Sequence, residues 1–199
     1  MDYLTLTEEI RQFTEQSVKK SRYEHSLRVA QMCARICRFY RLDADKGYLI
    51  GIAHDMCKDL PPEQMIATAS RDGLAVLELE VRKPSLLHGR AAAVLMKEKF
   101  GVKDKQMLEA IAVHTYGKVG MCDLSKALFI ADKIEPGRPQ ATPEYIENLF
   151  TYDFDGMFRA VLEENYEYVS KKGFEIYPET ESVMDFYIRN LENSENIEE

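Results

Sequence analysis

Apolar side chains recur every three or four residues along most of the chain, and this spacing places them on one face of a helix. Residues 23–40 give the clearest case, because Leu27, Ala30, Ala34 and Cys37 fall along one edge of the same face. The sequence contains no long run in which apolar and polar residues alternate, as they do in a half-buried strand. The pattern therefore predicts an all-α fold.

Residues that commonly begin or end helices divide this pattern into segments. Asp43 is expected to cap a helix that continues to about Lys58, and a glycine follows several other segments. Segment 74–85 is compatible with a short helix or an extended connector, and Pro84 favours the connector. Elsewhere, helices are expected at 6–20, 23–40, 43–58, 61–72, 87–100, 104–115, 124–135, 143–150, 155–172 and 179–191.

Length and composition favour one globular unit. The chain has 199 residues, of which 45% are hydrophobic, and this is enough to bury a sizeable core. We expect a single domain over 1–199, with a core at about 20–140, a helical extension at 141–190 and a frayed tail at 191–199. The start of the chain does not resemble a secretory signal, and no run of eighteen apolar residues occurs, so a cytoplasmic protein without a membrane segment is expected. The four cysteines form no CxxC pair and are expected to be reduced thiols in the core.

Charge is distributed unevenly along the sequence, whose formal net charge is −8. Residues 1–139 hold 22 basic and 19 acidic side chains, whereas residues 140–199 hold 4 and 15. The acidic part disfavours a nucleic-acid partner, because such binding depends on neutralising phosphates with Lys and Arg. A local site for a small anion is still allowed. Residues 140–199 also contain 11 of the 20 aromatic side chains, which leaves a homodimer open.

Each of the four histidines is expected to face the interior, because apolar residues lie three, four or seven positions away on the same predicted helix. A single inward histidine is more often a hydrogen-bonded core residue than a metal ligand. Burying four imidazoles with two carboxylates would be costly without compensating charge, whereas one or two cations would satisfy them all. The six side chains are His25, His54, Asp55, His88, His114 and Asp132.

The order of these six residues resembles the HD-domain superfamily of metal-dependent phosphohydrolases in its six-ligand, two-metal form. The segments HDMCKDL, LLHGRAA, AIAVHTYGKVGM and FIADKIEPGR resemble the bacterial YqeK family of symmetrical diadenosine tetraphosphate hydrolases. The resemblance covers about residues 20–140 in the correct order. It implies an HD-domain helical bundle on which the additional C-terminal helices pack.

The resemblance also implies a ligand assignment. One metal would be held by His25, His54, Asp55 and Asp132, and a second by His88 and His114, with Asp55 bridging the two ions. Iron is the first choice because related two-metal members use it, and manganese or cobalt are alternatives. A mixed imidazole and carboxylate set without cysteine argues against a structural zinc site.

Basic and hydroxyl side chains near these ligands are candidates for contacts with phosphate. Lys58 lies three residues after Asp55 and four after His54, so a continuing helix would place it on their face, although a solvated helix terminus is the alternative. Arg138 is a second candidate, and Thr115 either donates to phosphate or bonds its own backbone. Weaker candidates are Arg90, which departs from the family pattern, Lys118 and Lys133.

The resemblance implies hydrolysis of diadenosine tetraphosphate (Ap4A) at its central phosphoanhydride. Metal-activated hydroxide would attack phosphorus to give two ADP, with Asp55 and Lys58 as the catalytic residues. An HD phosphohydrolase acting on deoxynucleotides or cyclic nucleotides is the alternative within the same fold. Oxygenation by a di-iron centre and a non-catalytic metal-bound sensor are further alternatives. ADP as the sole product from the tetraphosphate distinguishes the first hypothesis from the others.

Overall fold

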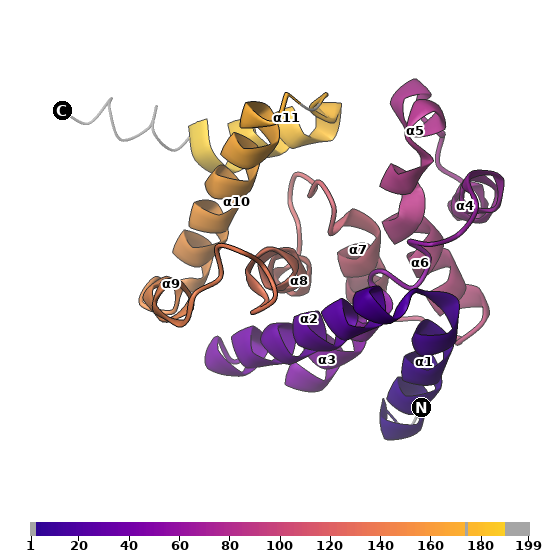
Figure 1. The fold of residues 1–199 in the computed structure, drawn as a ribbon, viewed down its shortest axis with the longest axis horizontal. Coiled ribbons are helices and arrows are strands. Elements are labelled where there is room, and N and C mark those ends of the chain that lie inside the picture. Colours follow the sequence, from indigo (N-terminus) through magenta and orange to yellow (C-terminus); the bar gives the residue numbers. More distant parts are fainter. Residues whose placement is uncertain (1–2, 174, 190–199) are drawn as a thin grey trace.

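The computed structural model describes residues 3–173 and 175–189, and the regular secondary structure of this part of the chain consists of helices, without a strand (Figure 1). The predicted all-α fold is therefore confirmed. The α-helices are α1 (Tyr3–Ser17), α2 (Lys20–Phe39), α3 (Ala44–Ala53), α4 (Pro62–Ala69), α5 (Glu78–Arg82), α6 (His88–Glu98), α7 (Lys105–Val113), α8 (Asp123–Ile134), α9 (Pro143–Leu149), α10 (Phe154–Lys171) and α11 (Pro178–Met184). Short 3₁₀ turns are η1 (Ser70–Asp72) and η2 (Pro84–Leu87), and a π-helical segment, η3, covers Asp185–Arg189.

Helices α2, α3 and α8 form the centre of the bundle, and α6 and α7 pack beside them. Helix α2 makes its most extensive contact with α3, and this contact includes a position where the two backbones approach closely. A Cβ atom at Gly51 would lie only 2.4 Å from the Cα atom of Ala30, which is too close for any side chain. A residue without a side chain is therefore needed at this crossing.

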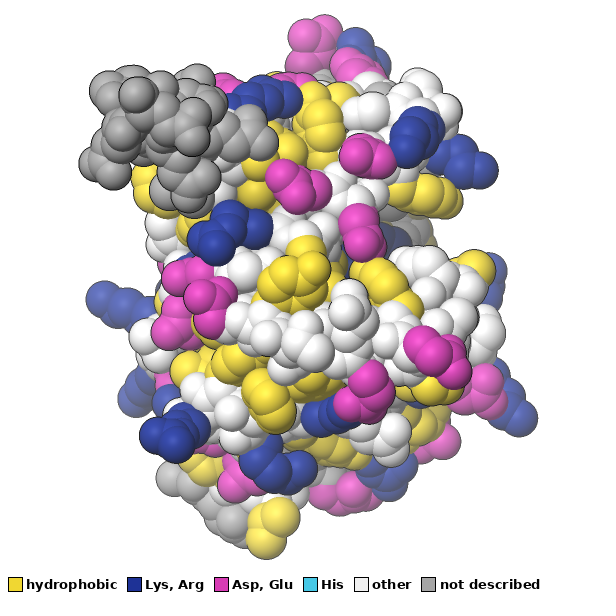
Figure 2. Space-filling view, turned by 90° about the vertical axis from the view of Figure 1, so that its left-hand side faces the viewer, with side chains coloured by type: hydrophobic (Ala, Val, Ile, Leu, Met, Phe, Trp, Pro, Cys, Tyr) yellow, Lys and Arg dark blue, Asp and Glu magenta, His cyan; other side chains and the backbone are white. Residues whose placement is uncertain are grey.

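The C-terminal helices share the core of the bundle. Phe158 of α10 packs edge-on against Phe129 of α8, with ring centroids 5.7 Å apart, and against Tyr187, with centroids 5.0 Å apart. The buried apolar cluster runs without a break from Leu6 to Ile188. The side of the molecule that carries α9 and α10 mixes hydrophobic, acidic and basic side chains (Figure 2).

Several predicted boundaries are wrong, and each has a local cause. The helix expected at 43–58 begins after its Asp43 cap but ends at Ala53, because the His54 ring nitrogen bonds the Gly51 carbonyl that the next turn would use. Tight turns follow, so Lys58 is not on a continuing helix. Segment 74–85 contains a short helix, α5, rather than only a connector, and the helix expected at 61–72 is divided into α4 and η1.

Two further expectations concern the ends of the chain and its cysteines. The tail 191–199 and the end of the helix expected at 179–191 lie outside the described residues. The four cysteines are free thiols, and three of them are buried. Among the described helices, none combines the length and apolar character needed to cross a bilayer.

Candidate metal centre

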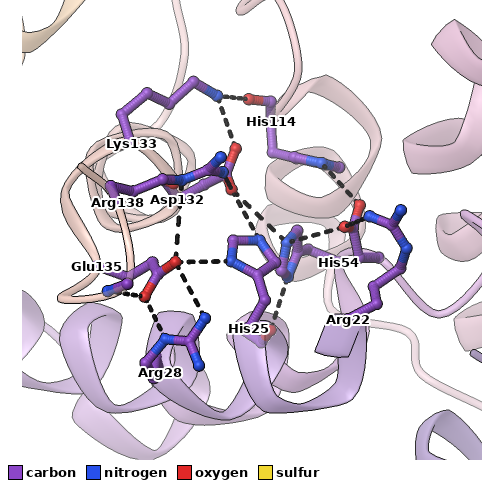
Figure 3. A network of polar contacts seen from close by, with 12 residues as sticks. Arg22, His25, Arg28, His54, His114, Asp132, Lys133, Glu135 and Arg138 are labelled. Carbon is purple, nitrogen blue, oxygen red and sulfur yellow. Dashed lines mark hydrogen bonds and ion pairs between the residues drawn. The ribbon is translucent and has the colours of Figure 1, made fainter. Parts of the chain in front are cut away.

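One half of the candidate centre is built by α2, the end of α3 and α8. His25 Nε2 lies 3.1 Å from Asp132 Oδ1, and His54 Nε2 lies 3.9 Å from the same oxygen. The rings of His25 and His54 meet edge to face, with centroids 5.3 Å apart. These side chains converge although they come from positions more than one hundred residues apart in the sequence (Figure 3).

The other half is built around Asp55 by residues of α6 and the end of α7. His88 Nε2 lies 3.0 Å from Asp55 Oδ1 and 3.0 Å from His114 Nε2, and His114 Nε2 lies 3.9 Å from the same carboxylate oxygen. All three side chains are almost fully buried. Asp55 therefore belongs to two donor groups, one with His25 and His54 and one with His88 and His114.

The backbone orients three of the imidazoles in the same way. In each case Nδ1 donates to a carbonyl of the preceding turn, which leaves Nε2 as the acceptor that faces the cluster. This arrangement is typical of histidine ligands, whose second nitrogen is held by an outer partner. The pairs are His54 with Gly51 at 2.7 Å, His88 with Ser85 at 2.6 Å and His114 with Ile111 at 2.7 Å.

The residues present fit a pair of divalent cations. His54 Nε2 is fully buried and has no hydrogen-bond partner within the described residues, which is costly unless a cation binds there. Burial lowers the pKa of His54 and, together with the neighbouring His88, that of His114, so both rings stay neutral as metal ligands must be. Burial alone would raise the pKa of Asp55 and of Asp132, but nearby positive charge, with Lys133 beside Asp132 and Lys58 beside Asp55, holds both pKa values well below the ordinary range. Both carboxylates are therefore ionised.

Comparison with known proteins assigns the fold that carries this cluster. The profile of the HD domain matches residues 22–137, more than half of the chain and the whole span of the six residues. The chain belongs to the HD domain family.

Relatives of this HD domain protein are similar over most of their length. A symmetrical bis(5′-nucleosyl)-tetraphosphatase of Staphylococcus aureus is 29% identical over 90% of this chain and 93% of its own. The protein of the same name from Halalkalibacterium halodurans is 30% identical over 85% of this chain and 90% of its own. The crystal structure of a predicted HD superfamily hydrolase involved in NAD metabolism from Clostridium acetobutylicum superimposes with a TM-score of 0.83 at 29% identity, covering 92% and 97% of the two chains. The resemblance to the YqeK family is thereby confirmed.

The sequence interpretation missed two charged partners of the HD cluster, the acidic Glu135 and the basic Arg22. Glu135 is 2% exposed and lies 3.0 Å from His25 Nδ1, while Arg28 and the Gly137 amide donate to its other oxygen (Figure 3). Although burial would raise it, hydrogen bonds from His25 and Arg28 lower the pKa of Glu135 to about 2. Its position three residues after Asp132, directly after the end of α8, was the available signal.

Arg22 was missed in the same way. Its guanidinium lies 3.0 Å from Asp55 Oδ2 and 3.3 Å from Asp59 Oδ1, and it precedes His25 by three residues on α2. Arg22 thus holds the carboxylate that both donor groups share. The spacing from His25 alone would have placed it on this face.

Four of the six candidates for phosphate contact line a cavity of about 320 Å³ that is also lined by five of the six candidate metal ligands, with the fully buried His54 behind them. Lys58 Nζ lies 3.1 Å from both ring nitrogens of His88, and burial lowers the pKa of Lys58. Lys133 donates to Asp132 Oδ2 at 2.9 Å, and Arg138 donates to Asp132 Oδ1 at 2.7 Å (Figure 3). Thr115 Oγ1 lies 3.5 Å from His88 Nε2.

The structure does not bring the other two candidates into this cavity. Arg90 is buried on the opposite side of α6 from His88, because residues two positions apart point in opposing directions on a helix. Its guanidinium pairs with Asp72 at 2.7 Å and Glu80 at 3.1 Å. Lys118 is half exposed and pairs with Glu109 at 3.2 Å. Both side chains hold surrounding segments together.

Proposed function

We propose that the chain hydrolyses diadenosine tetraphosphate symmetrically, adding one water across the central phosphoanhydride to give two ADP. The observation that carries the proposal is the pair of donor groups that share Asp55 in a cavity lined by basic side chains. Relatives that carry the name symmetrical bis(5′-nucleosyl)-tetraphosphatase support the choice of substrate. No covalent intermediate on the protein is needed.

In this proposal His25, His54, Asp55 and Asp132 hold one divalent ion, and His88 and His114 hold a second together with Asp55. Iron is the first choice, with manganese or cobalt as alternatives, because the donors are imidazoles and carboxylates without thiolates. When bound, two such ions supply an activated water and positive charge for the phosphate oxygens. The second imidazole nitrogens donate to protein acceptors and keep the rings oriented.

The basic residues of the cavity have a separate task. A tetraphosphate carries several negative charges, and the protein as a whole is acidic, so local cations are needed for binding. Lys58, Lys133 and Arg138 supply them from the turn after α3, from α8 and from the loop after α8. Thr115 can donate one further hydrogen bond to a phosphate oxygen.

The experiment combines product chromatography with metal analysis. Purified protein loaded with iron, manganese or cobalt is expected to hold about two equivalents of metal and to convert Ap4A into ADP alone. His54→Ala removes a donor with no other partner, so we expect less bound metal and no turnover. AMP and ATP among the products, or persistent turnover by the variant, would refute the assignment.

We also propose that residues 1–199 form a single HD-type domain that acts in the cytoplasm. The continuous core from Leu6 to Ile188 supports one domain in which the extension 141–190 is packed on the HD core. Light scattering after size exclusion measures whether the protein is a homodimer. A protein without affinity for DNA or RNA at physiological salt is expected from its acidic C-terminal part.

A further inference from the structure

A second cavity of about 620 Å³ adjoins the metal cavity. The two share part of their walls, namely Asp132, Lys133 and Arg138. On the far side of these residues, the second cavity is enclosed by the loop after α8, by α9 and by α10. This size is within the range of cavities that bind small organic ligands, about 300–1,000 Å³.

The wall contributed by α10 is one face of that helix. Val161, Glu164, Asn165 and Tyr168 are spaced by three, four and seven residues, so their side chains lie along the same side. Tyr145 of α9 and the loop residues Pro139 and Gln140 complete the lining. The metal cavity is lined mostly by charged and imidazole side chains, whereas this one is lined largely by aromatic, aliphatic and amide groups.

Two tyrosines of the second cavity differ in their freedom to meet a ligand. The hydroxyl of Tyr145 donates to the Glu164 carboxylate, so this pair is already engaged. Tyr168 is 58% exposed, and the ring contact recorded for it is with Lys172, whose Nζ lies 5.7 Å from the ring centroid. An exposed aromatic ring at the wall of a cavity is a suitable platform for a nucleobase, because every base has a π-face.

Asn165 supplies hydrogen-bonding groups one turn from Tyr168. Its half-buried side chain lines the cavity, and its amide makes no hydrogen bond with another described residue. A side-chain amide presents a donor NH₂ group beside an acceptor oxygen, and this arrangement matches N7 and the N6 amino group of adenine. Guanine presents two acceptors along the same edge, so the amide fits adenine better.

We propose that the second cavity binds one nucleoside of the substrate, with its base stacked on Tyr168 and its edge contacted by Asn165. This inference rests on the proposed function, because it continues the polyphosphate from the metal cavity into its neighbour. Lys133 and Arg138, which face both cavities, lie where the α- and β-phosphates of that half join the nucleoside. The nucleoside site determines how well substrate binds and leaves the chemical step to the metal cavity.

The test uses Tyr168→Ala in the metal-loaded protein, with Tyr152→Ala as a control. Tyr152 is also exposed, at 46%, and lies before α10 outside the second cavity. Loss of one base–aromatic stack is expected to raise KM for Ap4A and Kd for ADP about 5- to 100-fold, with kcat within about threefold of wild type. Tyr168→Phe retains the ring and is expected to bind like wild type. Binding of inorganic diphosphate, which has no base, should be unchanged in every variant.

Calorimetric titration with ADP and with diphosphate separates the two proposals. The nucleoside site is refuted if Tyr168→Ala binds ADP as tightly as Tyr152→Ala does. It is also refuted if Tyr168→Ala loses as much affinity for diphosphate as for ADP. If wild type makes no ADP from Ap4A, the proposed function fails, but the comparison of ADP with diphosphate still tests the second cavity. Asn165→Ala removes both the donor and the acceptor, so it is expected to reduce the preference for ADP over GDP, and an unchanged preference contradicts the role of Asn165.

Discussion

Replacing Glu135 by Gln is expected to weaken metal binding although Glu135 is not itself a donor to the centre. One carboxylate oxygen accepts hydrogen bonds from Arg28 Nε and the Gly137 amide, and the other faces His25 Nδ1 at 3.0 Å and accepts a longer bond from Arg28 Nη2 at 3.4 Å. In the variant, the amide oxygen must stay with the two donors, so the amide NH₂ group meets His25. Two donors then oppose each other unless His25 carries its proton on Nε2. That tautomer has no lone pair to offer a cation at Nε2.

The expected loss is about 10- to 100-fold in metal affinity, which corresponds to about 1.4–2.7 kcal/mol. Titration of the apoprotein with manganese in competition with a chelator measures this quantity directly, independently of turnover. The same variant should lose activity at limiting metal and regain most of it at saturating metal. Its thermal unfolding shows whether the fold is retained.

Glu147→Gln provides the matched control. Glu147 also pairs with an arginine, Arg35, at 2.7 Å, but it is exposed and distant from the cluster. The control should bind metal like wild type. If Glu135→Gln binds manganese with wild-type affinity, or if both variants weaken equally, Glu135 does not orient His25.

Two further predictions concern stability. Burial alone would raise the pKa of Asp72, but hydrogen bonds from Arg90 lower it. The ionised carboxylate therefore stabilises the fold above the unfolded pKa of about 4, and this stabilisation is lost as the pH falls through the lower pKa of the folded state. Asp72→Asn should therefore cost about 2 kcal/mol at pH 7 in urea unfolding and flatten the stability profile below pH 5, and an unchanged acid limb would contradict this. Gly51→Ala places a methyl group against the Ala30 backbone and is expected to destabilise the protein by about 1–3 kcal/mol, whereas a stabilised variant would show that the two helices separate freely.

Much of the fold was predictable because helical periodicity is a local property. The Asp43 cap was identified correctly, and its carboxylate accepts from the amides of Asp45 and Lys46. The end of the same helix was not predicted, because it depends on the His54 ring bonding a backbone carbonyl. Segment 74–85 was compatible with a short helix or a connector, and the connector favoured near Pro84 was the wrong choice, because the segment contains the five-residue α5.

The convergence of the histidines was predicted from their inward spacing and from the family resemblance. The roles of charged residues next to the candidate ligands were harder to predict, because such a side chain can point toward the metal centre or away from it. Arg90 follows His88 by two positions and turns toward Asp72, whereas Glu135 follows Asp132 by three and turns inward. Helical spacing could distinguish these two cases, but the partners that pair with them come from other helices and cannot be read locally.

The missing side chain at Gly51 has a consequence for where the imidazoles stand. Direct backbone contact with Ala30 leaves α2 and α3 no room to slide along or past each other without a clash. His25 lies on α2. His54 is the C-cap residue of α3, three positions after Gly51. The positions of the two rings are thus fixed by a crossing point that binds no metal itself, so a substitution there would displace the imidazoles without replacing any of the six donor residues.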